Sequence, residues 1–323
     1  MEKLTGRDYN ILAEIDRNPK VSFHQIGKKL RLSPSVVERR IKNLINKGVI
    51  REFQAIINYK KLGYTYYSVY ARFQNQNELK RKKILNYLKE HPLSGQVLLC
   101  DGRWQLVYGF FARDVFQLNE ELKKVDALFY NYFKDAEKVI HIGSHHYYRG
   151  YLPGGEGVRK DEPFLGGPEP FEKIDEESRK ILNSLRGGAR RNIVELSKEL
   201  GISLDKFRYR LKSLREKKIL LGSWVHLNPE KLGLQFYRLL LKLKSLSREK
   251  EKALLYFLNK HPHVIRANHI FGSWNFLIDL EINAPAFREF MNAFMKHFSE
   301  DVLEYETIIV YDEVKFVFSP LFS

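Results

Sequence analysis

Apolar residues recur every three or four positions along the first part of the chain, which is the period of helices that bury one face. The pattern predicts a first helix from about Gly6 to Arg17, with Thr5 as its N-cap. A second helix follows Ser22, and Gln25 stands at capping-box spacing from that serine. A tight turn then leads into a third helix, so the pattern predicts three short helices in succession.

The third helix lies in the stretch LSPSVVERRIKNLINKGVI, residues 32–50. Ser33 is a good N-cap, Pro34 suits the first helical position, and Gly48 ends the helix. The apolar face consists of Val37, Ile41, Leu44 and Ile45. The polar face consists of Ser35, Glu38, Arg39, Lys42, Asn43 and Asn46. Three helices with this turn predict a helix-turn-helix unit, whose last helix would enter the major groove of DNA.

After this helix the pattern changes to the alternation that is typical of strands. We expect strands at 49–58, 64–73, 96–100, 105–111 and 138–148, and helices at 78–90 and 115–129. In the helix at 78–90 the inward face is expected to be Leu79, Ile84, Leu85 and Leu88. From residue 64 onward the order is β-α-β-β-α-β, the order of the ferredoxin-like fold. The predicted fold class is therefore α+β.

The second half of the chain repeats the first at a shift of 170 residues, as between Gly63 and Gly233. The same shift pairs Ser33, Arg40, Lys42, Leu44, His91, Gly102 and Trp104 with Ser203, Arg210, Lys212, Leu214, His261, Gly272 and Trp274. Such agreement without a gap indicates that one unit was duplicated and fused. The segment 151–173, rich in Gly, Pro and charge, is predicted to be a linker. The predicted domains are a helix-turn-helix unit at 1–60, an αβ domain at 61–150, the linker, a second helix-turn-helix unit at 174–230 and a second αβ domain at 231–323.

The composition adds a strong positive charge. The sequence has 55 Lys and Arg against 39 Asp and Glu, a formal net charge of +16, so a polyanion such as DNA or RNA is the first partner to consider. A Lys-rich solubilising surface, as in heat-adapted proteins, is the alternative explanation. The single cysteine, Cys100, excludes an internal disulfide framework and a multi-cysteine zinc site, and is consistent with a reducing compartment.

Other chemistry is sparse in the sequence. No apolar run approaches the roughly 18 residues that a membrane-spanning helix needs, and the N-terminal segment lacks an apolar signal. We therefore expect a cytoplasmic protein without a membrane partner. His145 and His146 point to opposite faces of a strand and cannot chelate one metal ion as a unit. Because no Gly-rich phosphate loop, nucleophile elbow or H-E-x-x-H motif occurs, we expect no enzyme activity, no metal and no cofactor.

Several stretches of the sequence resemble the leucine-responsive regulator family, Lrp/AsnC. The resemblance is carried by LSPSVVERRIKNLINKGVI, by NYKKLG at 58–63, and by a glycine turn in the middle hairpin of the αβ domain. It covers nearly the whole chain, twice, and implies that each αβ domain is similar to the family's ligand-sensing RAM domain. By resemblance, the chain is a transcription regulator that binds double-stranded DNA as a covalent pseudo-dimer. A homodimer through the RAM-like sheets and a contact with a basal transcription factor are further expected partners.

The outward faces of the two recognition helices supply the candidate DNA contacts. Base edges are expected to be read by Ser35, Glu38, Arg39 and Asn43 in the first helix and by Lys206, Arg208 and Tyr209 in the second. Phosphate contacts are expected at Lys28, Lys29, Arg40, Lys42, Lys198, Arg210 and Lys212, although each is equally consistent with a solvated charge. Because the two faces differ, the half-sites should differ, and they should lie about one DNA turn, ~34–36 Å, or a multiple of it apart. A ligand at the αβ domains would then regulate binding by changing this spacing.

The turn of the middle hairpin in each αβ domain indicates which class of effector could bind. Family members that bind amino acids commonly have a G-x-x-D turn there, but here the turns read GRWQ at 102–105 and GSWN at 272–275. An amide therefore stands where a carboxylate would pair with an amino group, which implies a small-molecule effector other than a free amino acid. Its candidate contacts are Gly102, Trp104, Gln105, Gly272, Trp274 and Asn275. The alternative is that both tryptophans pack in a core or an interface.

Two other functions remain open. Sirohaem decarboxylases are similar to this family in fold, are sometimes fused in pairs, and use His and Arg residues near the same hairpin. Arg266, His269, Trp274 and Asn275 in RANHIFGSWNF resemble that hairpin, and cations would suit a substrate with many carboxylates, but LLCDGRWQLV in the first half has no histidine. A recruitment platform for the transcription machinery is the third possibility, and it would combine weak, sequence-indifferent DNA binding with tight binding to a basal factor.

Overall fold

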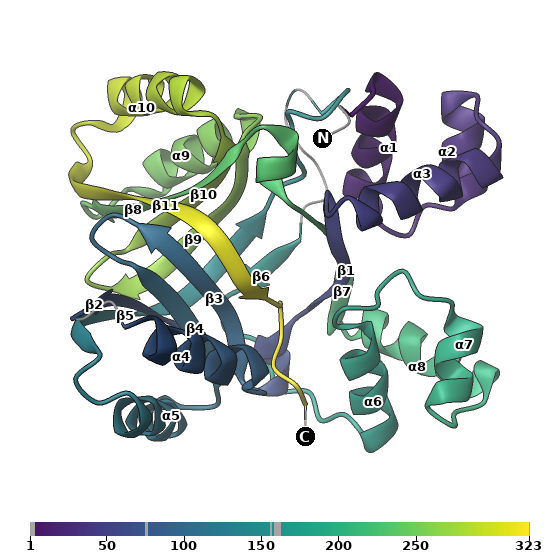
Figure 1. Ribbon diagram of the computed structural model, residues 1–323, viewed down its shortest axis with the longest axis horizontal. Helices are drawn as coiled ribbons and strands as arrows, with labels where there is room; N and C mark the ends of the chain where they lie inside the picture. Colours follow the sequence, from purple (N-terminus) through teal and green to yellow (C-terminus); the bar gives the residue numbers. More distant parts are fainter. Residues whose placement is uncertain (1–3, 75–76, 156, 158–162, 323) are drawn as a thin grey trace.

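The computed structural model describes residues 4–74, 77–155, 157 and 163–322. Two helical units lie on one side of the molecule and two αβ domains on the other (Figure 1). The first helical unit consists of α1 (Gly6–Arg17), α2 (Phe23–Leu30) and α3 (Pro34–Asn46), and the second of α6 (Glu176–Leu185), α7 (Ile193–Glu199) and α8 (Leu204–Glu216). The predicted caps are confirmed, since Thr5 and Ser22 form capping boxes and Ser33 caps α3.

The β-α-β-β-α-β order is confirmed in both halves. The first αβ domain consists of β2 (Thr65–Phe73), α4 (Glu78–Glu90), β3 (Ser94–Asp101), β4 (Leu106–Ala112), α5 (Val115–Leu128) and β5 (Phe133–His146). The second consists of β8 (Gln235–Leu243), α9 (Arg248–Lys260), β9 (Val264–Gly272), β10 (Phe276–Ile282), α10 (Ala284–Phe298) and β11 (Val302–Phe316). Short 3-10 turns, η1 (Tyr59–Leu62) and η2 (Pro229–Leu232), precede the two domains.

The two αβ domains share one closed sheet. Its strands follow the order β2-β4-β3-β11-β8-β10-β9-β5, and β2 also pairs with β5, so the sheet closes on itself as a barrel. The short β6 (Phe164–Gly166) pairs with the far end of β5. One apolar cluster inside the barrel takes Tyr70 and Trp104 from the first domain and Leu240 and Trp274 from the second. The four helices of the αβ domains cover the outside of the barrel (Figure 1).

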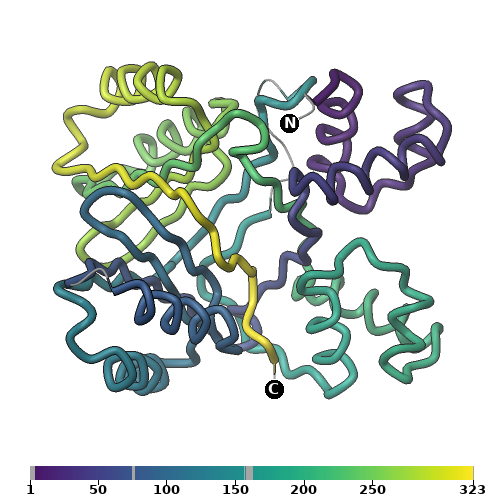
Figure 2. Tube along the Cα trace, in the orientation of Figure 1, coloured from purple at the N-terminus to yellow at the C-terminus, as the bar shows by residue number. Residues whose placement is uncertain are grey.

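A ribbon of two strands joins the helical units. β1 (Ile50–Ile57) follows α3 and pairs antiparallel with β7 (Leu220–Leu227), which follows α8. Figure 2 shows the ribbon running between the two units. A single apolar core continues from Ile11 and Ile41 in the first unit to Ile181 and Leu211 in the second. The two helical units and the ribbon therefore pack as one body.

Each helical unit is docked on the αβ domain of the other half. Arg149 pairs with Asp16 of α1 at 2.6 Å and with Glu281 of β10 at 2.7 Å, which ties the first unit to the second domain. The C-terminal segment does the reverse, because the Phe322 carbonyl accepts from Asn183 of α6 while the amide of the neighbouring Leu321 donates to the carbonyl of Pro92. The docking is therefore crossed between the halves.

Part of the predicted linker at 151–173 has regular structure, so that prediction was wrong there. Leu152 is buried, and β6, with the buried Leu165, extends the sheet. A segment rich in Gly and Pro shows no periodicity, and a three-residue strand is too short to produce one. Residues 156 and 158–162 of the predicted linker lie outside the described residues.

Two residues predicted to face inward are exposed. Ile45 is 42% exposed, because the buried stripe of α3 is narrower than predicted, and Leu79 is 72% exposed, because burial in α4 begins only at Ile84. The sheets expected to pair with a second copy of the chain pair with each other within one chain, and a homodimer through them stays a prediction. Among the described residues, no helix is both long and apolar enough to cross a bilayer.

Candidate functional site

The two recognition helices turn their polar faces to solvent. On α3, Ser35, Arg39 and Asn43 are exposed, and on α8, Arg208 is exposed and Tyr209 is 66% exposed. The opposite faces are buried through Val37, Ile41 and Leu44 on α3, and through Phe207, Leu211 and Leu214 on α8. The helix faces therefore have the predicted orientation, and most of the expected base-reading side chains are accessible.

Three of the predicted DNA contacts are held by the protein itself. Arg40 donates to Asp8 at 2.8 Å, Arg210 pairs with Asp175 at 2.6 Å, and Lys206 pairs with Glu177 at 2.6 Å. In each case the acid lies at the start of the first helix of the same unit. These contacts fix each recognition helix against its neighbour, so we assign the part-buried Arg40 and Arg210 a positioning role, whereas Lys206, whose side chain is 51% exposed, stays accessible to DNA.

The electrostatics of the Arg40 pair agree with this role. Partial burial would raise the pKa of Asp8, but hydrogen bonds from Thr5 and the adjacent Arg40 guanidinium hold it below its ordinary value. The carboxylate is therefore charged at neutral pH and keeps its arginine. The side chain of Arg40 is only 25% exposed, which limits its reach toward a phosphate.

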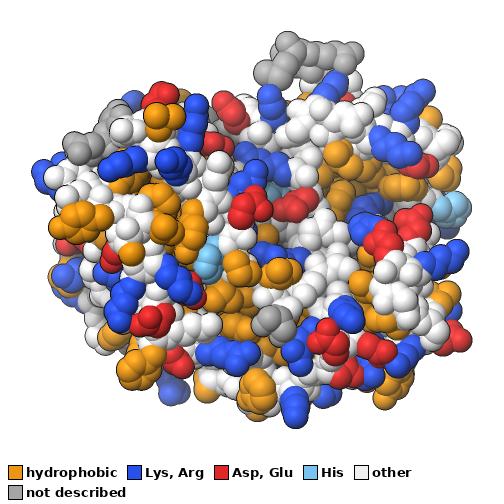
Figure 3. All heavy atoms as spheres, turned by 60° about the horizontal axis from the view of Figure 1, so that its bottom comes forward, with side chains coloured by type: hydrophobic (Ala, Val, Ile, Leu, Met, Phe, Trp, Pro, Cys, Tyr) orange, Lys and Arg blue, Asp and Glu red, His pale blue; other side chains and the backbone are white. Residues whose placement is uncertain are grey.

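The remaining basic candidates are accessible. Lys28 and Lys198 are exposed, and Lys29, Lys42 and Lys212 form ion pairs with Glu14, Glu38 and Glu216 at 2.7, 2.8 and 3.7 Å. Exposed lysine pairs contribute about 0–1 kcal/mol, so a phosphate can replace the carboxylate at little cost. Basic side chains are spread over the face seen in Figure 3 with acidic ones between them, so charge alone does not mark the interface.

The residues predicted to contact an effector have structural roles instead. Trp104 and Trp274 are 0% and 3% exposed and pack in the barrel interior, which confirms the alternative given for them. The Gln105 side chain accepts from the amide of Phe73 at 3.0 Å, and the Asn275 side chain both accepts from and donates to the backbone of Leu243. Each amide thereby holds the end of the neighbouring strand.

Gly102 and Gly272, in the turns of the two hairpins, also have a structural role. Their φ angles are +113° and +148°, values that favour glycine, so both residues serve the hairpin backbone. A Cβ on Gly272 would lie 2.6 Å from the carbonyl oxygen of Lys138. The geometry of the hairpin backbone therefore explains why both halves have glycine at this turn.

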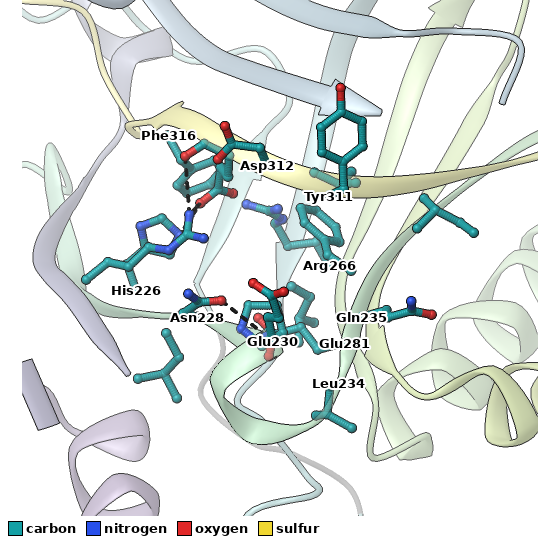
Figure 4. A pocket seen from close by; sticks show the side chains of 18 of the residues that line it. His226, Asn228, Glu230, Leu234, Gln235, Arg266, Glu281, Tyr311, Asp312 and Phe316 are labelled. Carbon is teal, nitrogen blue, oxygen red and sulfur yellow. Dashed lines mark hydrogen bonds and ion pairs between the residues drawn. The ribbon is translucent and has the colours of Figure 1, made fainter. Parts of the chain in front are cut away.

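A chamber of about 180 Å³, here called the charged chamber, lies between the ribbon and the barrel. Figure 4 shows His226 of β7, Arg266 of β9, Glu281 of β10 and Tyr311 of β11 around it. Arg149 also lines this chamber, where it stacks on Trp224 at 5.0 Å. The chamber therefore adjoins the contact that docks α1 on the second αβ domain.

Several of the charges around the chamber compensate each other. Burial alone would lower the pKa of His226, but Glu313 beside it raises the pKa above its ordinary value. Burial would raise the pKa of Glu313, yet His226 and Arg51 lower it. Arg266 pairs with Asp279 at 2.9 Å, and this carboxylate also pairs with Arg238 at 2.8 Å. The site is thus rich in ionised groups that already have partners.

The repeat places an equivalent chamber on the other side, and its chemistry differs. Gln96, Phe111 and Gly143 stand at the positions of Arg266, Glu281 and Glu313. This aromatic chamber has a volume of only about 50 Å³ and is lined by Tyr59, Tyr66, Phe111, His141 and other residues. The rings of Tyr66 and Phe111 lie 4.7 Å apart. The aromatic chamber is also lined by Arg238, Arg266 and Asp279, so the clearest difference between the two chambers is the room inside them.

Sequence reasoning missed both chambers. A signal was present, because Arg238, Arg266, Asp279 and Glu281 interrupt strands that are otherwise apolar, and charges there must be paired if they are buried. Asp279 finds Arg238 and Arg266 on the neighbouring strands of its own domain. The partner of Glu281, by contrast, depends on the crossed docking, which no local pattern reveals. Among the described residues, no three His, Cys, Asp or Glu side chains are placed to hold a metal ion.

Comparison with known proteins follows the same division into units. A family model for winged helix-turn-helix DNA-binding domains matches residues 4–51 and 174–220. The transcriptional regulator Ptr1 of Methanocaldococcus jannaschii is 30% identical over 115 residues, which is 36% of this chain and 76% of that regulator. The regulator LrpA of Pyrococcus horikoshii is 31% identical over 108 residues, 33% of this chain and 75% of LrpA.

One solved structure is similar over both halves at once. The siroheme decarboxylase NirDL aligns with a TM-score of 0.61 at 13% identity, and the alignment covers 98% of this chain and 94% of that chain. At this identity the likeness shows the fold, with two units arranged in tandem.

Proposed function

Because this chain belongs to the Lrp/AsnC family of transcription regulators and carries the family's unit twice, we propose that it binds double-stranded DNA sequence-specifically as a covalent pseudo-dimer. Each helical unit would hold one half-site. The observation that carries the proposal is that α3 and α8 both expose a polar face while their other faces are packed into one shared core. Two recognition helices packed on one shared core suit two half-sites at a fixed separation.

The half-sites should differ in sequence. Glu38 and Arg39 of α3 correspond to Arg208 and Tyr209 of α8, so the side chains offered to base edges are not the same. An asymmetric bipartite operator is therefore the expected target. The shared core and the β1–β7 ribbon make it difficult to slide one unit relative to the other, which favours one spacing over several.

Regulation is proposed to act through the charged chamber. Arg149 stands at its wall and bonds to both α1 and β10, so a ligand that competes for Arg149 would loosen the first unit. Such a ligand would shift the population of the DNA-binding arrangement by its differential affinity for the two states. An effector that carries its own carboxylates fits this competition better than a free amino acid, which brings one carboxylate and an uncompensated cation.

The alternative is a sirohaem-decarboxylase-like enzyme. It is favoured by the whole-chain likeness to NirDL and by the arginines and histidine around the charged chamber. The pairing of these groups weighs against it, because Arg149, Arg238 and Arg266 are each bound to protein carboxylates and would have to exchange partners to bind a substrate's carboxylates. We therefore propose that the chain is not an enzyme, and turnover of sirohaem by the purified chain would contradict this.

The proposal is tested by selecting bound fragments from a random DNA pool and titrating salt against the best fragment and a scrambled one. The expected result is an asymmetric bipartite motif with half-sites about one turn apart, ~34–36 Å, and a specificity ratio of ~10³ or more. Failure to enrich a motif, with the same salt slope for both fragments, would reject specific recognition. Tight capture of a basal factor in that case would favour the recruitment platform.

A further inference from the structure

A hollow between the two helical units collects cations from both of them. Arg17 and Lys20, at the end of α1, line one side, and Arg215 and Lys218, at the end of α8, line the other. We call it the basic hollow. None of its described lining residues is an Asp or a Glu. Like charges from two separate units are therefore brought together at one place.

Among the residues that the structure describes, most of this charge has no carboxylate beside it. Arg17 pairs with Glu14 at 3.1 Å and donates to the Pro153 carbonyl. In the described part of the chain, the side chains of Lys20, Arg215 and Lys218 have no carboxylate partner. Desolvation within the hollow and repulsion from Arg215 lower the pKa of Lys20 to about 8. An anion placed between these groups would relieve that repulsion.

The backbone at Lys218 supplies independent evidence. Lys218 has a φ of +54°, in the left-handed region that glycine tolerates best, and the first half has Gly48 at the equivalent position with a φ of +68°. An L side chain adopts this conformation only at a cost in stability. The second half therefore keeps a lysine where the fold would prefer glycine, and this lysine lines the basic hollow.

The repeat does not carry the same cations at the equivalent positions. The positions equivalent to Arg17, Arg215 and Lys218 are Gly187, Ile45 and Gly48. The equivalent of Lys20 is Arg190, whose guanidinium donates to the carbonyls of Pro19 and Val21 at 2.6 and 2.9 Å. Arg190 thus fixes the turn that carries Lys20, so the approach of the two units at this place is built into the structure.

We propose that the basic hollow binds one phosphate group, and that in the DNA complex this is a backbone phosphate between the two half-sites. Lys and Arg side chains converging from several directions give the charge-assisted hydrogen bonds that phosphate oxygens accept. Because both units contribute, the contact forms only when both are docked. That the bound phosphate belongs to DNA rests on the proposed function, whereas the binding of a phosphate group does not.

The test uses the full chain and the selected duplex, with single neutral methylphosphonates placed at successive positions between the half-sites. The wild type should lose about tenfold in affinity at one or two positions, as for the loss of one charged hydrogen bond. Lys218→Gly should weaken binding of the unmodified duplex about tenfold, lower the salt slope by about 0.9, and show no further loss at those positions.

Controls separate binding from folding. Lys218→Gly removes a strained conformation, so it should melt no lower than the wild type. Arg215→Gln is a second variant and should show the same coupling to the same phosphate. Lys134→Gln removes one charge from an exposed position on β5, away from the hollow, and should leave the methylphosphonate pattern unchanged.

A second arm distinguishes the source of the phosphate, by titrating inorganic pyrophosphate into the protein without DNA in a calorimeter. Saturable binding that Lys218→Gly abolishes, without coupling to any DNA position, would support the phosphate site and assign it to a small phosphorylated ligand. Neither coupling nor pyrophosphate binding would overturn the proposal. A wild type that binds no specific DNA would reject the proposed function, and the pyrophosphate titration would still decide the site.

Discussion

Two adjacent arginines on α3 show how residue-level function depends on partners from other elements. Arg39 is exposed, whereas Arg40 is 25% exposed and bonded to Asp8 of α1. Helical periodicity placed Arg39 on the polar face, and the sequence predicted Arg40 to be a phosphate contact. The caps were predicted correctly because capping is local. The Arg40–Asp8 pair joins two helices, so no spacing rule within α3 indicates it.

Replacing Arg39 by Ala should weaken specific DNA binding by about 1–3 kcal/mol and relax the preference at one base position. The reason is that an exposed arginine on the groove-facing side loses its bonds to a base edge. Competition binding against single-base variants of the site measures this. Lys42→Ala is the matched control and should weaken all sequences alike, with a salt slope lower by about 1. An equal loss for every sequence in Arg39→Ala would identify Arg39 as a phosphate contact.

The His226–Glu313 pair should make stability depend on pH. Glu313 raises the folded-state pKa of His226 above its ordinary value despite burial, so the stabilisation is present below about pH 6.5 and is lost as pH rises through the raised pKa. Urea unfolding of the wild type and His226→Gln should differ by about 2 kcal/mol near pH 6, with the difference shrinking toward pH 9. A difference that stays constant over this range would show that the histidine is not charged in the folded protein.

Element by element, the sequence indicated which segments form helices and strands, but not which strands pair. The β-α-β-β-α-β order of both halves is confirmed. The strand that follows α3, however, pairs with β7 of the other half. Alternation defines the two faces of a strand and leaves its edge partner undefined. The same limit explains why the chambers were not foreseen, because both are lined by residues from the two halves of the chain.

Replacing Arg149 by Met should release α1 from β10. The change leaves Asp16 and Glu281 buried without their partner, a loss of about 3–5 kcal/mol in docking. Hydrogen exchange should accelerate in α1, and DNA binding should lose the first half-site before the second. Arg186→Met is the matched control, because the side chain of Arg186, the equivalent of Asp16, donates to the Ser319 carbonyl at 3.0 Å and has no carboxylate partner among the described residues. Equal exchange in α1 and α6 of Arg149→Met would contradict the crossed docking.

At the scale of the whole molecule, the duplication was visible in the sequence and the closure of the barrel was not. Identical residues that recur at a shift of 170 positions indicate two copies of one unit. That β2 meets β5 and that β11 meets both β3 and β8 follows from the twist and packing of two sheets, which the pattern of one strand cannot report. The two halves thereby pair with each other through strands that a second chain would otherwise need.

Because the recognition helices α3 and α8 have different polar faces, each variant is expected to select a different motif. Arg39→Ala should degrade the sequence preference of one half-site, and Arg208→Ala that of the other, each by about 1–3 kcal/mol. In a homodimer either substitution would alter both halves. Repeating the fragment selection with each variant gives the result directly. Loss of preference in both halves from one substitution would imply that two chains bind together, each through the same unit.

The crossed docking also constrains how the chain can fold while it is being made. β1 must wait for β7, and Arg149 must wait for Glu281, which is synthesised 132 residues later. Until then, the first αβ domain has open strand edges and an uncovered apolar face that later becomes the barrel interior. Domains usually fold one at a time from the N-terminus, and long-range pairing is slow. Synthesis of this protein therefore passes through a long interval in which its first half depends on protection from aggregation.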